Sequence, residues 1–371
     1  ALLEAERVGS GPSGRNSGFV IDQPHNVDPE DVEDLEANRR VKRLGQAGVA
    51  ELRGLVQRHA IDCGWSEAGK VHGAVGARGE RLLDALARGL DRLGEPFEVL
   101  GADRAAAALG TRHYTRALRT PGCVLVQPAA LVRGLARALP PGVDLHEESP
   151  VRSLRRDGAG WRLETPRATI RAAKVILATD AFTRGLGFLR DRLVPVYTFA
   201  SLTRPVPELA GEPEWGLLPA HKAGSTLRRL GDGRLLVRNA FRYGGGLRSS
   251  PGHLAWAQRF HLDALRTRFP GQPIALESTW GGVVCFTRNF APFFGRLHDG
   301  LYAAVGTNGV GIAKGTISGR LIAELALEAR SELLDDLLAF PRPTWVPPEP
   351  FLGLGARARL AWEQRRAGAE R

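Results

Sequence analysis

The sequence of 371 residues contains no methionine, only three cysteines and only five lysines among its 51 basic residues. Cys63, Cys123 and Cys285 are odd in number and form no C-x-x-C pair, so their spacing predicts neither a zinc site nor a disulfide framework. The nine histidines include no H-x-H or H-x-x-x-H pair, and we therefore expect no metal site. With so few cysteines, a reducing cytoplasm is the expected location.

Long apolar runs are missing as well. No stretch of about 18 apolar residues is present, which argues against a membrane-spanning helix. The first residues include no basic segment followed by an apolar one, so no secretory signal is visible. Because there is no initiator methionine, and because Leu2 and Leu3 read as the inside of a strand, we expect the chain to begin within a longer protein.

Acidic residues are outnumbered, and the formal net charge at pH 7 is +11. A basic protein can bind nucleic acid, an anionic membrane or an acidic substrate. The arginines are spread along the whole chain, however, and no aromatic–basic interleaving or nucleic-acid module accompanies them. We interpret the excess of arginine over lysine as the composition of a GC-rich genome and expect no nucleic-acid partner. A nucleic-acid-binding protein would instead lose affinity steeply with salt.

Hydrophobic periodicity indicates the fold class. At about 150 residues per domain, the length predicts two domains or two interleaved lobes. We expect strands near residues 1–4, 64–75, 123–126, 143–146, 151–155, 161–165, 168–178, 193–202, 234–239 and 301–305. We expect helices near 29–59 (capped by Asp28), 80–93, 128–139, 254–269 and 312–329, with a short one in the proline-rich tail. This order favours an α/β nucleotide domain interrupted by a β-rich insert.

Three local motifs point to a nucleotide site, and two of them lie near the start. Glu4 ends the first strand, where an acidic residue can hydrogen-bond the ribose of an adenosine. In the loop Gly9–Gly18, small residues let backbone N–H groups approach a phosphate or a flavin ring, and Arg15 and Asn16 add polar groups. Alone, these features are also compatible with a solvated strand end and a flexible loop.

The third motif connects the strand 301–305 to a helix through residues 306–311, Gly-Thr-Asn-Gly-Val-Gly. Helix N-terminal amides make such a turn a site for negative charge, such as a pyrophosphate or the pyrimidine edge of a reduced flavin. Lys314 could reinforce the site, although a lysine in the first helical turn more often faces solvent. The glycine spacing alone is weak evidence for a nucleotide site, and its position between a strand and a helix makes that evidence stronger.

Taken in order, these segments resemble the D-amino-acid-oxidase-type (DAO) family of FAD-dependent oxidoreductases, which includes glycine, sarcosine and γ-glutamylputrescine oxidases. The segments are Leu2–Ala5, Ser13–Gly18, Val151, Leu177–Ala181, Trp280–Gly282, Pro292–Arg296 and Gly306–Ile312. The resemblance implies an α/β fold with an α+β cap, in which a Rossmann-like FAD-binding domain is interleaved with a β-rich substrate domain. The family's first strand and its G-x-G-x-x-G turn are missing from this N-terminally truncated chain, so we expect FAD to bind poorly or not at all.

The same resemblance implies a division of the chain into alternating parts. We expect the FAD-binding domain in residues 1–58, 123–190 and 280–330. The substrate or cap domain is expected in residues 59–122 and 191–279. Residues 331–371 are expected to form a C-terminal wrap.

The implied activity is oxidation of a C–N bond of an amine or amino acid, by hydride transfer to flavin N5 and hydrolysis of the imine. The acceptor of the electrons is oxygen or another molecule, and oxidase and dehydrogenase remain open. The resemblance assigns cofactor contacts to Glu4, Ala5, Ser13, Gly14, Arg15, Asn16, Ser17, Val151, Ala178, Thr179, Gly306, Asn308, Gly309, Val310, Gly311 and Ile312. Cys285 lies about two or three residues out of register with the cysteine that binds flavin covalently in some relatives, which favours non-covalent FAD.

Substrate contacts are harder to place. The family holds a substrate carboxylate with arginine and surrounds the amine with aromatic side chains. The candidates in the expected insert are Arg238, Arg242, Tyr243 and Trp280, although arginine is abundant here and aromatic residues in a sheet usually pack. The catalytic residues stay unknown, since the flavin carries the chemistry. The alternative function is a non-catalytic relative or accessory subunit that binds a nucleotide.

Overall fold

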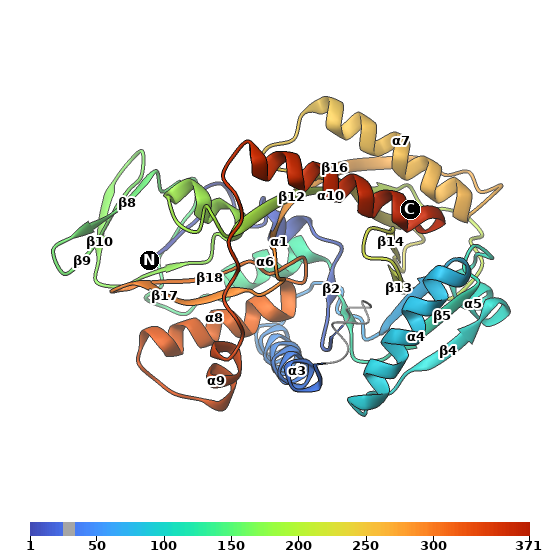
Figure 1. Cartoon of the computed structure of the whole chain (residues 1–371), viewed down its shortest axis with the longest axis horizontal. Coiled ribbons are helices and arrows are strands. Elements are labelled where there is room, and N and C mark those ends of the chain that lie inside the picture. The colour runs from blue at the N-terminus through green and yellow to red at the C-terminus, as the bar shows by residue number, and fades with distance from the viewer. Residues whose placement is uncertain (25–33) are drawn as a thin grey trace.

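The largest element of the computed structural model, which describes residues 1–24 and 34–371, is a mixed sheet of eight strands (Figure 1). All neighbouring strands are antiparallel except β13 and β3, which are parallel. The strand order is β16 (Leu276–Thr287), β12 (Leu193–Thr203), β15 (Leu235–Tyr243), β14 (Thr226–Arg229), β13 (Trp215–Pro219), β3 (Lys70–Ala74), β5 (Arg116–Thr120) and β4 (Glu98–Gly101).

The remaining strands form small sheets, most of them on the side of the N-terminus and one, with β2 (Phe19–Val20), near the middle of the molecule (Figure 1). Two of them contain parallel pairs that connect distant segments, as in nucleotide-binding folds. One joins β1 (Leu2–Leu3) to β7 (Leu145–His146), and the other joins β11 (Val175–Leu177) to β18 (Leu301–Val305). The others are antiparallel: β17 (Phe293–His298) with β18, β8 (Ser153–Asp157) with β9 (Gly160–Glu164) and β10 (Thr169–Ala172), and β2 (Phe19–Val20) with β6 (Val124–Leu125).

Helices cover these sheets on several sides (Figure 1). Below β17 and β18 lie α3 (Leu35–Arg58), α8 (Ile312–Ala326) and α9 (Glu332–Leu338). A side chain at Gly48 would collide with the carbonyl of Ala313, so this glycine lets α3 approach α8 closely. The other helices are α1 (Pro12–Arg15), α4 (Gly76–Arg92), α5 (Ala102–Leu109), α6 (Pro128–Arg137), α7 (Pro251–Arg268) and α10 (Phe351–Ala367), with 3₁₀ segments at Asp180–Leu186 and Gly368–Glu370.

The main core lies between the eight-stranded sheet and the helices α5 and α7. Leu217, Leu227 and Val237 point from the sheet into one buried cluster with Leu109 of α5 and Leu265 of α7. Complete burial of such a side chain contributes about 1.5–3 kcal/mol. This cluster fixes the positions of β14 and β15, which also border the cavity described below.

The C-terminal end of the chain, which follows α10, is held by hydrogen bonds to residues on the side of the eight-stranded sheet, Arg268 of α7 and His221 after β13. Arg268 is 1% exposed, and its guanidinium donates to the carbonyls of Glu370 and Arg371 at 2.8 and 2.7 Å and to Tyr114 Oη at 3.0 Å. The Glu370 carboxylate accepts a hydrogen bond from the His221 N–H at 2.6 Å. These contacts hold the end of α10, which lies beside α7 and is connected to α9 by an irregular segment that crosses the face of the molecule (Figure 1).

The expected elements differ from the observed ones, and hydrophobic periodicity did not predict the strands β4, β5, β13, β14, β16 and β17 or the helices α5 and α9. The segment 168–178 is two strands, because β10 pairs with β9 whereas β11 pairs with β18. The tail helix α10 has 17 residues and is not short. The helix expected at 29–59 occupies 35–58, with the Asp34 side chain accepting from the Ala37 N–H at 2.9 Å. The proposed cap Asp28 lies outside the described residues. Within the described residues, no helix combines the length and apolarity needed to cross a membrane.

Candidate active site

A cavity of about 3120 Å³ lies between the small sheets and the eight-stranded sheet. Ligand pockets commonly measure about 300–1,000 Å³, so this one has room for a dinucleotide together with a second small molecule. Its walls include the loop around α1, the turn after β11, the turn between β18 and α8, and the facing strands β12, β15 and β16.

The loop around α1 is held in shape by its own side chains. The Asn16 amide donates to the Ser13 carbonyl at 2.7 Å, and its Oδ1 accepts from the Gly18 N–H at 2.8 Å. A side chain at Gly14 would collide with the carbonyl of Gly9, so only glycine fits there. The Arg15 carbonyl accepts from Trp280 Nε1 at 2.8 Å, which fastens the loop to β16.

The turn after β11 contains an aspartate that organises three strand ends. Asp180 Oδ1 accepts hydrogen bonds from the N–H groups of Gly306 and Thr307 at 2.8 and 3.4 Å, and Oδ2 accepts from the Cys285 N–H at 3.3 Å. Burial raises the pKa of this carboxyl above its usual value, against the opposing effect of these donors. Although Asp180 falls in a segment that resembles the family, no site role was predicted for it.

The turn between β18 and α8 is held by Asn308. Its amide donates to the carbonyls of Phe290 and Gly306 at 2.8 and 2.9 Å, and its Oδ1 accepts from the Thr287 N–H at 2.9 Å. Gly309 has a φ of +85°, in the left-handed region, and is exposed to the cavity. Among residues 1–24 and 34–371, no side chain caps the N-terminus of α8 at Gly311, and the positive end of the dipole of this 15-residue helix faces the cavity.

Lys314 lines the cavity in the first turn of α8, where solvent exposure was the more common expectation. The side chain is half-buried, and burial lowers the pKa of its ammonium group. None of the described residues forms a hydrogen bond or ion pair with it. A cation placed beside an uncapped helix N-terminus makes this end of the cavity favourable for an anion.

The structure places most predicted cofactor residues on one surface. The carboxylate of Glu4, at the end of β1, accepts from the Glu6 N–H at 3.0 Å. Gly14 and Gly306 contact the protein chain instead of the cavity. The predicted residues that line the cavity are Glu4, Ala5, Ser13, Arg15, Asn16, Ser17, Val151, Ala178, Thr179, Asn308, Gly309, Val310, Gly311 and Ile312.

These residues fit FAD on three observations. The cavity is larger than one small-molecule pocket requires. A side chain on Gly11 would meet no atom within 4 Å, so the loop around α1 leaves open space for a ligand against its backbone. The α8 N-terminus and Lys314, which has no ion-pair partner among the described residues, would complement the anionic groups of the cofactor.

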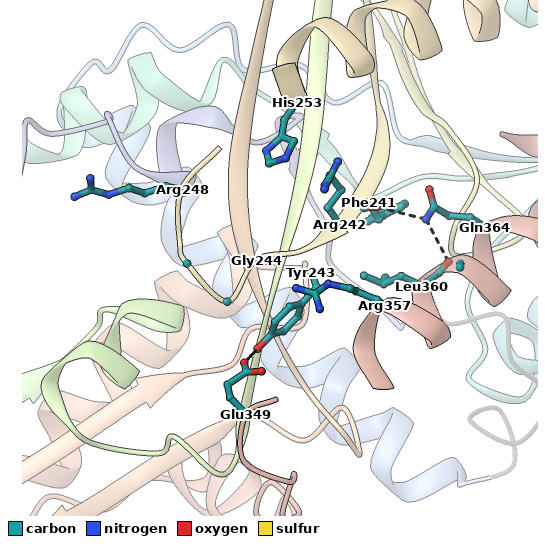
Figure 2. A pocket seen from close by; sticks show the side chains of 13 residues that line it. Phe241, Arg242, Tyr243, Gly244, Arg248, His253, Glu349, Arg357, Leu360 and Gln364 are labelled. Atoms are coloured by element: carbon teal, nitrogen blue, oxygen red, sulfur yellow. Dashed lines mark hydrogen bonds between the residues drawn. The ribbon is translucent and has the colours of Figure 1, made fainter. Parts of the chain in front are cut away.

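The predicted substrate residues separate into two groups. Arg238 and Trp280 line the large cavity. The Arg238 guanidinium donates to Thr226 Oγ1 at 2.9 Å, lies 5.3 Å from the Phe241 ring and has no carboxylate partner in the described part of the chain. Burial lowers its pKa to about 10. Arg242 and Tyr243 instead line a neighbouring pocket of about 650 Å³ (Figure 2).

The cysteines do not contribute to the cavity surface. Cys63, Cys123 and Cys285 are all free and buried, and none lines the cavity. Burial raises the pKa of the Cys285 thiol far above its usual value, so the thiolate needed for covalent attachment is disfavoured. Within residues 1–24 and 34–371, no group of three or more His, Cys, Asp or Glu side chains could hold a metal ion.

Comparison with known proteins gives consistent matches. The family model "FAD dependent oxidoreductase" (DAO) matches residues 1–325. The probable oxidoreductase OrdL of Rhizobium meliloti (strain 1021) is 27% identical over 92% of this chain and 82% of its own length. The gamma-glutamylputrescine oxidoreductase of Escherichia coli (strain K12) is 26% identical over 92% of this chain and 80% of its own length. The crystal structure of glycine oxidase from Geobacillus kaustophilus shares the fold, with a TM-score of 0.72 and 23% identity over 89% of this chain and 88% of that one.

Proposed function

Because the chain belongs to the DAO family of FAD dependent oxidoreductases, we propose that it oxidises a C–N bond of an amine or amino acid that carries a carboxylate. The fold class expected from the sequence is confirmed by the solved relatives. The names of two similar proteins, a gamma-glutamylputrescine oxidoreductase and a glycine oxidase, support a nitrogen-bearing substrate. The observation that carries the proposal is the Arg238 guanidinium, which borders the same cavity as the cofactor surface and has no carboxylate partner among the described residues.

FAD would lie along the residues of the large cavity. Glu4 would hold the adenosine ribose, Ser13–Ser17 would line the pyrophosphate and flavin, and Gly309–Ile312 with Lys314 would face the pyrimidine edge. The bound cofactor would supply a two-electron acceptor that takes a hydride from the carbon next to the substrate nitrogen, after which the imine hydrolyses. Burial of Cys285 supports non-covalent binding. The electron acceptor is oxygen or another molecule.

The residues of the chain would orient the substrate. The Arg238 guanidinium keeps free N–H groups that can bind a carboxylate, and its bond to Thr226 Oγ1 fixes its direction. Contact with the Phe241 ring holds the guanidinium plane and excludes water from one of its faces. Trp280 lies on the same cavity wall, where its ring can cover the amine end. These contacts would set the substrate carbon in one orientation, which is the protein's main contribution.

We also propose the interleaved division into two domains. The segments 59–122 and 191–279 contribute β3, β4, β5, β12, β13, β14 and β15 to one sheet, which supports a substrate domain made of two parts of the chain. The small sheets, two of which contain parallel pairs, come from residues 2–20, 124–177 and 293–305, which supports an FAD-binding domain made of three parts of the chain. A cytoplasmic location and the absence of a nucleic-acid partner stay predictions.

Substitution of Arg238 tests the substrate proposal. In Arg238→Ala, KM should rise roughly 10- to 100-fold for carboxylate-bearing amines, because a charged hydrogen bond contributes about 1.5–3 kcal/mol. Neutral amines should change much less. Arg266→Ala removes an exposed arginine of α7 away from both pockets and serves as the matched control. Equal changes for acidic and neutral amines would remove Arg238 from this role.

A further inference from the structure

A second pocket of about 650 Å³ adjoins the large cavity and is formed by the end of β15, the loop after it, and the helices α7 and α10 (Figure 2). We call it the arginine pocket, after Arg242 of β15 and Arg357 of α10. The two cavities share the lining residues Phe241, Gly246, Arg248, Leu360 and Gln364. The two cavities are therefore adjacent at these residues.

The two arginines that give the pocket its name have no carboxylate partner in the described chain. The Arg357 guanidinium lies 5.7 Å from the Tyr243 ring, and that of Arg242 lies 5.7 Å from the Trp256 ring. Packing against a ring uses the face of a guanidinium and leaves its N–H edge available. Arg248 also lines the pocket, but its side chain points away from the other labelled residues in Figure 2.

The one acidic residue of the pocket is already engaged. One oxygen of Glu349 accepts from the Tyr243 hydroxyl, and the other accepts from the Gly353 N–H at 3.1 Å. His253 adds a donor, because its Nδ1 accepts from the Ser250 N–H at 3.2 Å and its proton therefore lies on Nε2. The pocket lining carries more positive than negative charge, with Arg242, Arg248 and Arg357 against Glu349. An excess of guanidinium groups favours an anionic group such as a carboxylate.

We propose that the arginine pocket binds a second carboxylate at the far end of the substrate, so that this chain selects amines or amino acids with two acidic groups. The inference rests on the proposed function, which places the first carboxylate at Arg238. Arg238 and Arg242 lie four residues apart on β15, so their backbones are separated by at most roughly 13 Å, because the irregularity at Ala240 shortens the strand. The substrate would be elongated, passing the Phe241 ring that borders both cavities.

The position of α10 supports a role in specificity. Arg357, Leu360 and Gln364 lie beyond residue 325, where the match to the family model ends. The Gln364 amide donates to the Phe241 carbonyl at 3.4 Å, which fastens α10 to β15, and Arg268 holds the end of the chain. The pocket wall is thus contributed by a fixed helix outside the segment that defines the family. Such a wall can set substrate length without altering the cofactor surface.

Calorimetric titration with linear dicarboxylates tests the pocket without any turnover. The probes are the series from glutarate to sebacate, compared with monocarboxylates of equal length, on the FAD-loaded protein. One dicarboxylate should bind at least about tenfold more tightly than its monocarboxylate. Arg242→Gln and Arg357→Gln should remove this difference and leave monocarboxylate binding unchanged. Arg365→Gln, an exposed position on the same helix, should behave as wild type.

Several outcomes would overturn the proposal. Equal affinity for dicarboxylates and monocarboxylates would do so, as would a preference that survives both substitutions in variants with wild-type melting temperatures. Inorganic phosphate that displaces the dicarboxylate more effectively than a monocarboxylate does would contradict the carboxylate assignment. Failure of the protein to oxidise any amine would refute the proposed function alone, because ligand binding is measured independently of oxidation.

Discussion

Replacement of Asp180 should weaken both the fold and the cofactor surface. Its carboxylate accepts from three backbone N–H groups, those of Gly306 at 2.8 Å, Thr307 at 3.4 Å and Cys285 at 3.3 Å. These donors belong to the turn before α8 and to β16, which both border the large cavity. In Asp180→Ala all three donors would lose their acceptor at once.

The magnitude follows from those contacts. A buried donor left without a partner costs about 1–3 kcal/mol, which sets an upper limit of several kcal/mol for the alanine variant. Removal of a buried carboxylate, whose pKa is raised by desolvation, offsets part of the loss. We therefore expect Asp180→Ala to lower the free energy of unfolding by roughly 2–5 kcal/mol. Asp180→Asn keeps one acceptor oxygen and should lose about 1–3 kcal/mol.

Urea unfolding of the apoprotein, followed by circular dichroism, measures the change in the free energy of unfolding. Quenching of FAD fluorescence measures the change in FAD affinity. We expect both variants to bind FAD more weakly than wild type, with alanine weaker than asparagine. Asp335→Ala on α9, away from the cavity, is a matched control for loss of an aspartate. An alanine variant with unchanged unfolding free energy and unchanged FAD affinity would refute the role of Asp180.

Three further predictions concern the same structure. Gly309→Glu should abolish FAD retention by placing a carboxylate in the anion-binding turn. Gly309→Ala is the control, because it has the same backbone strain at a φ of +85° without the charge. Full FAD occupancy of the glutamate variant in an absorption spectrum would show that this turn does not bind the cofactor. Lys314→Met should raise the melting temperature of the apoprotein, because it removes a desolvated ammonium group, and should lower the affinity for FAD by about tenfold. An FAD affinity equal to that of wild type would contradict a contact between Lys314 and the cofactor. Burial lowers the pKa of His113 and His261 to about 4, so the unfolded chain binds more protons than the folded chain between pH 6.5 and 4. The free energy of unfolding should therefore decrease as the pH is lowered through this range, by up to about 2.7 kcal/mol per pH unit. Urea midpoints from pH 7 to 4.5 measure this slope, and a slope in His261→Gln equal to that of wild type would contradict the assignment.

The local parts of the site could be predicted from the sequence. The loop Gly9–Gly18 and the turn 306–311 are short strings of small residues beside a strand, and their chemistry is readable without distant contacts. The parts that depend on distant contacts could not. Asp180 gains its role only because β11, β16 and β18 end at one place. Arg268 reads as one more surface arginine, yet it is 1% exposed and anchors the C-terminus.

Register explains why two substrate candidates lie elsewhere. Arg238 and Arg242 are both in β15, and a regular strand would direct residues four apart to the same face. The register of β15 with β12 shifts between Tyr197 and Phe199, and Ala240 adopts a φ of 63°. A β-bulge of this kind redirects the following side chains. Arg242 and Tyr243 consequently line the arginine pocket, and no local sequence pattern marks the irregularity.

The central claim, FAD-dependent oxidation of an amine or amino acid, is tested most directly by a visible absorption spectrum. The spectrum of the FAD-loaded protein should be recorded under anaerobic conditions, before and after addition of a panel of amines and amino acids. The account predicts flavin bands that bleach with carboxylate-bearing members of the panel, most readily with those that carry two acidic groups. Flavin bands that no member of the panel bleaches would contradict it.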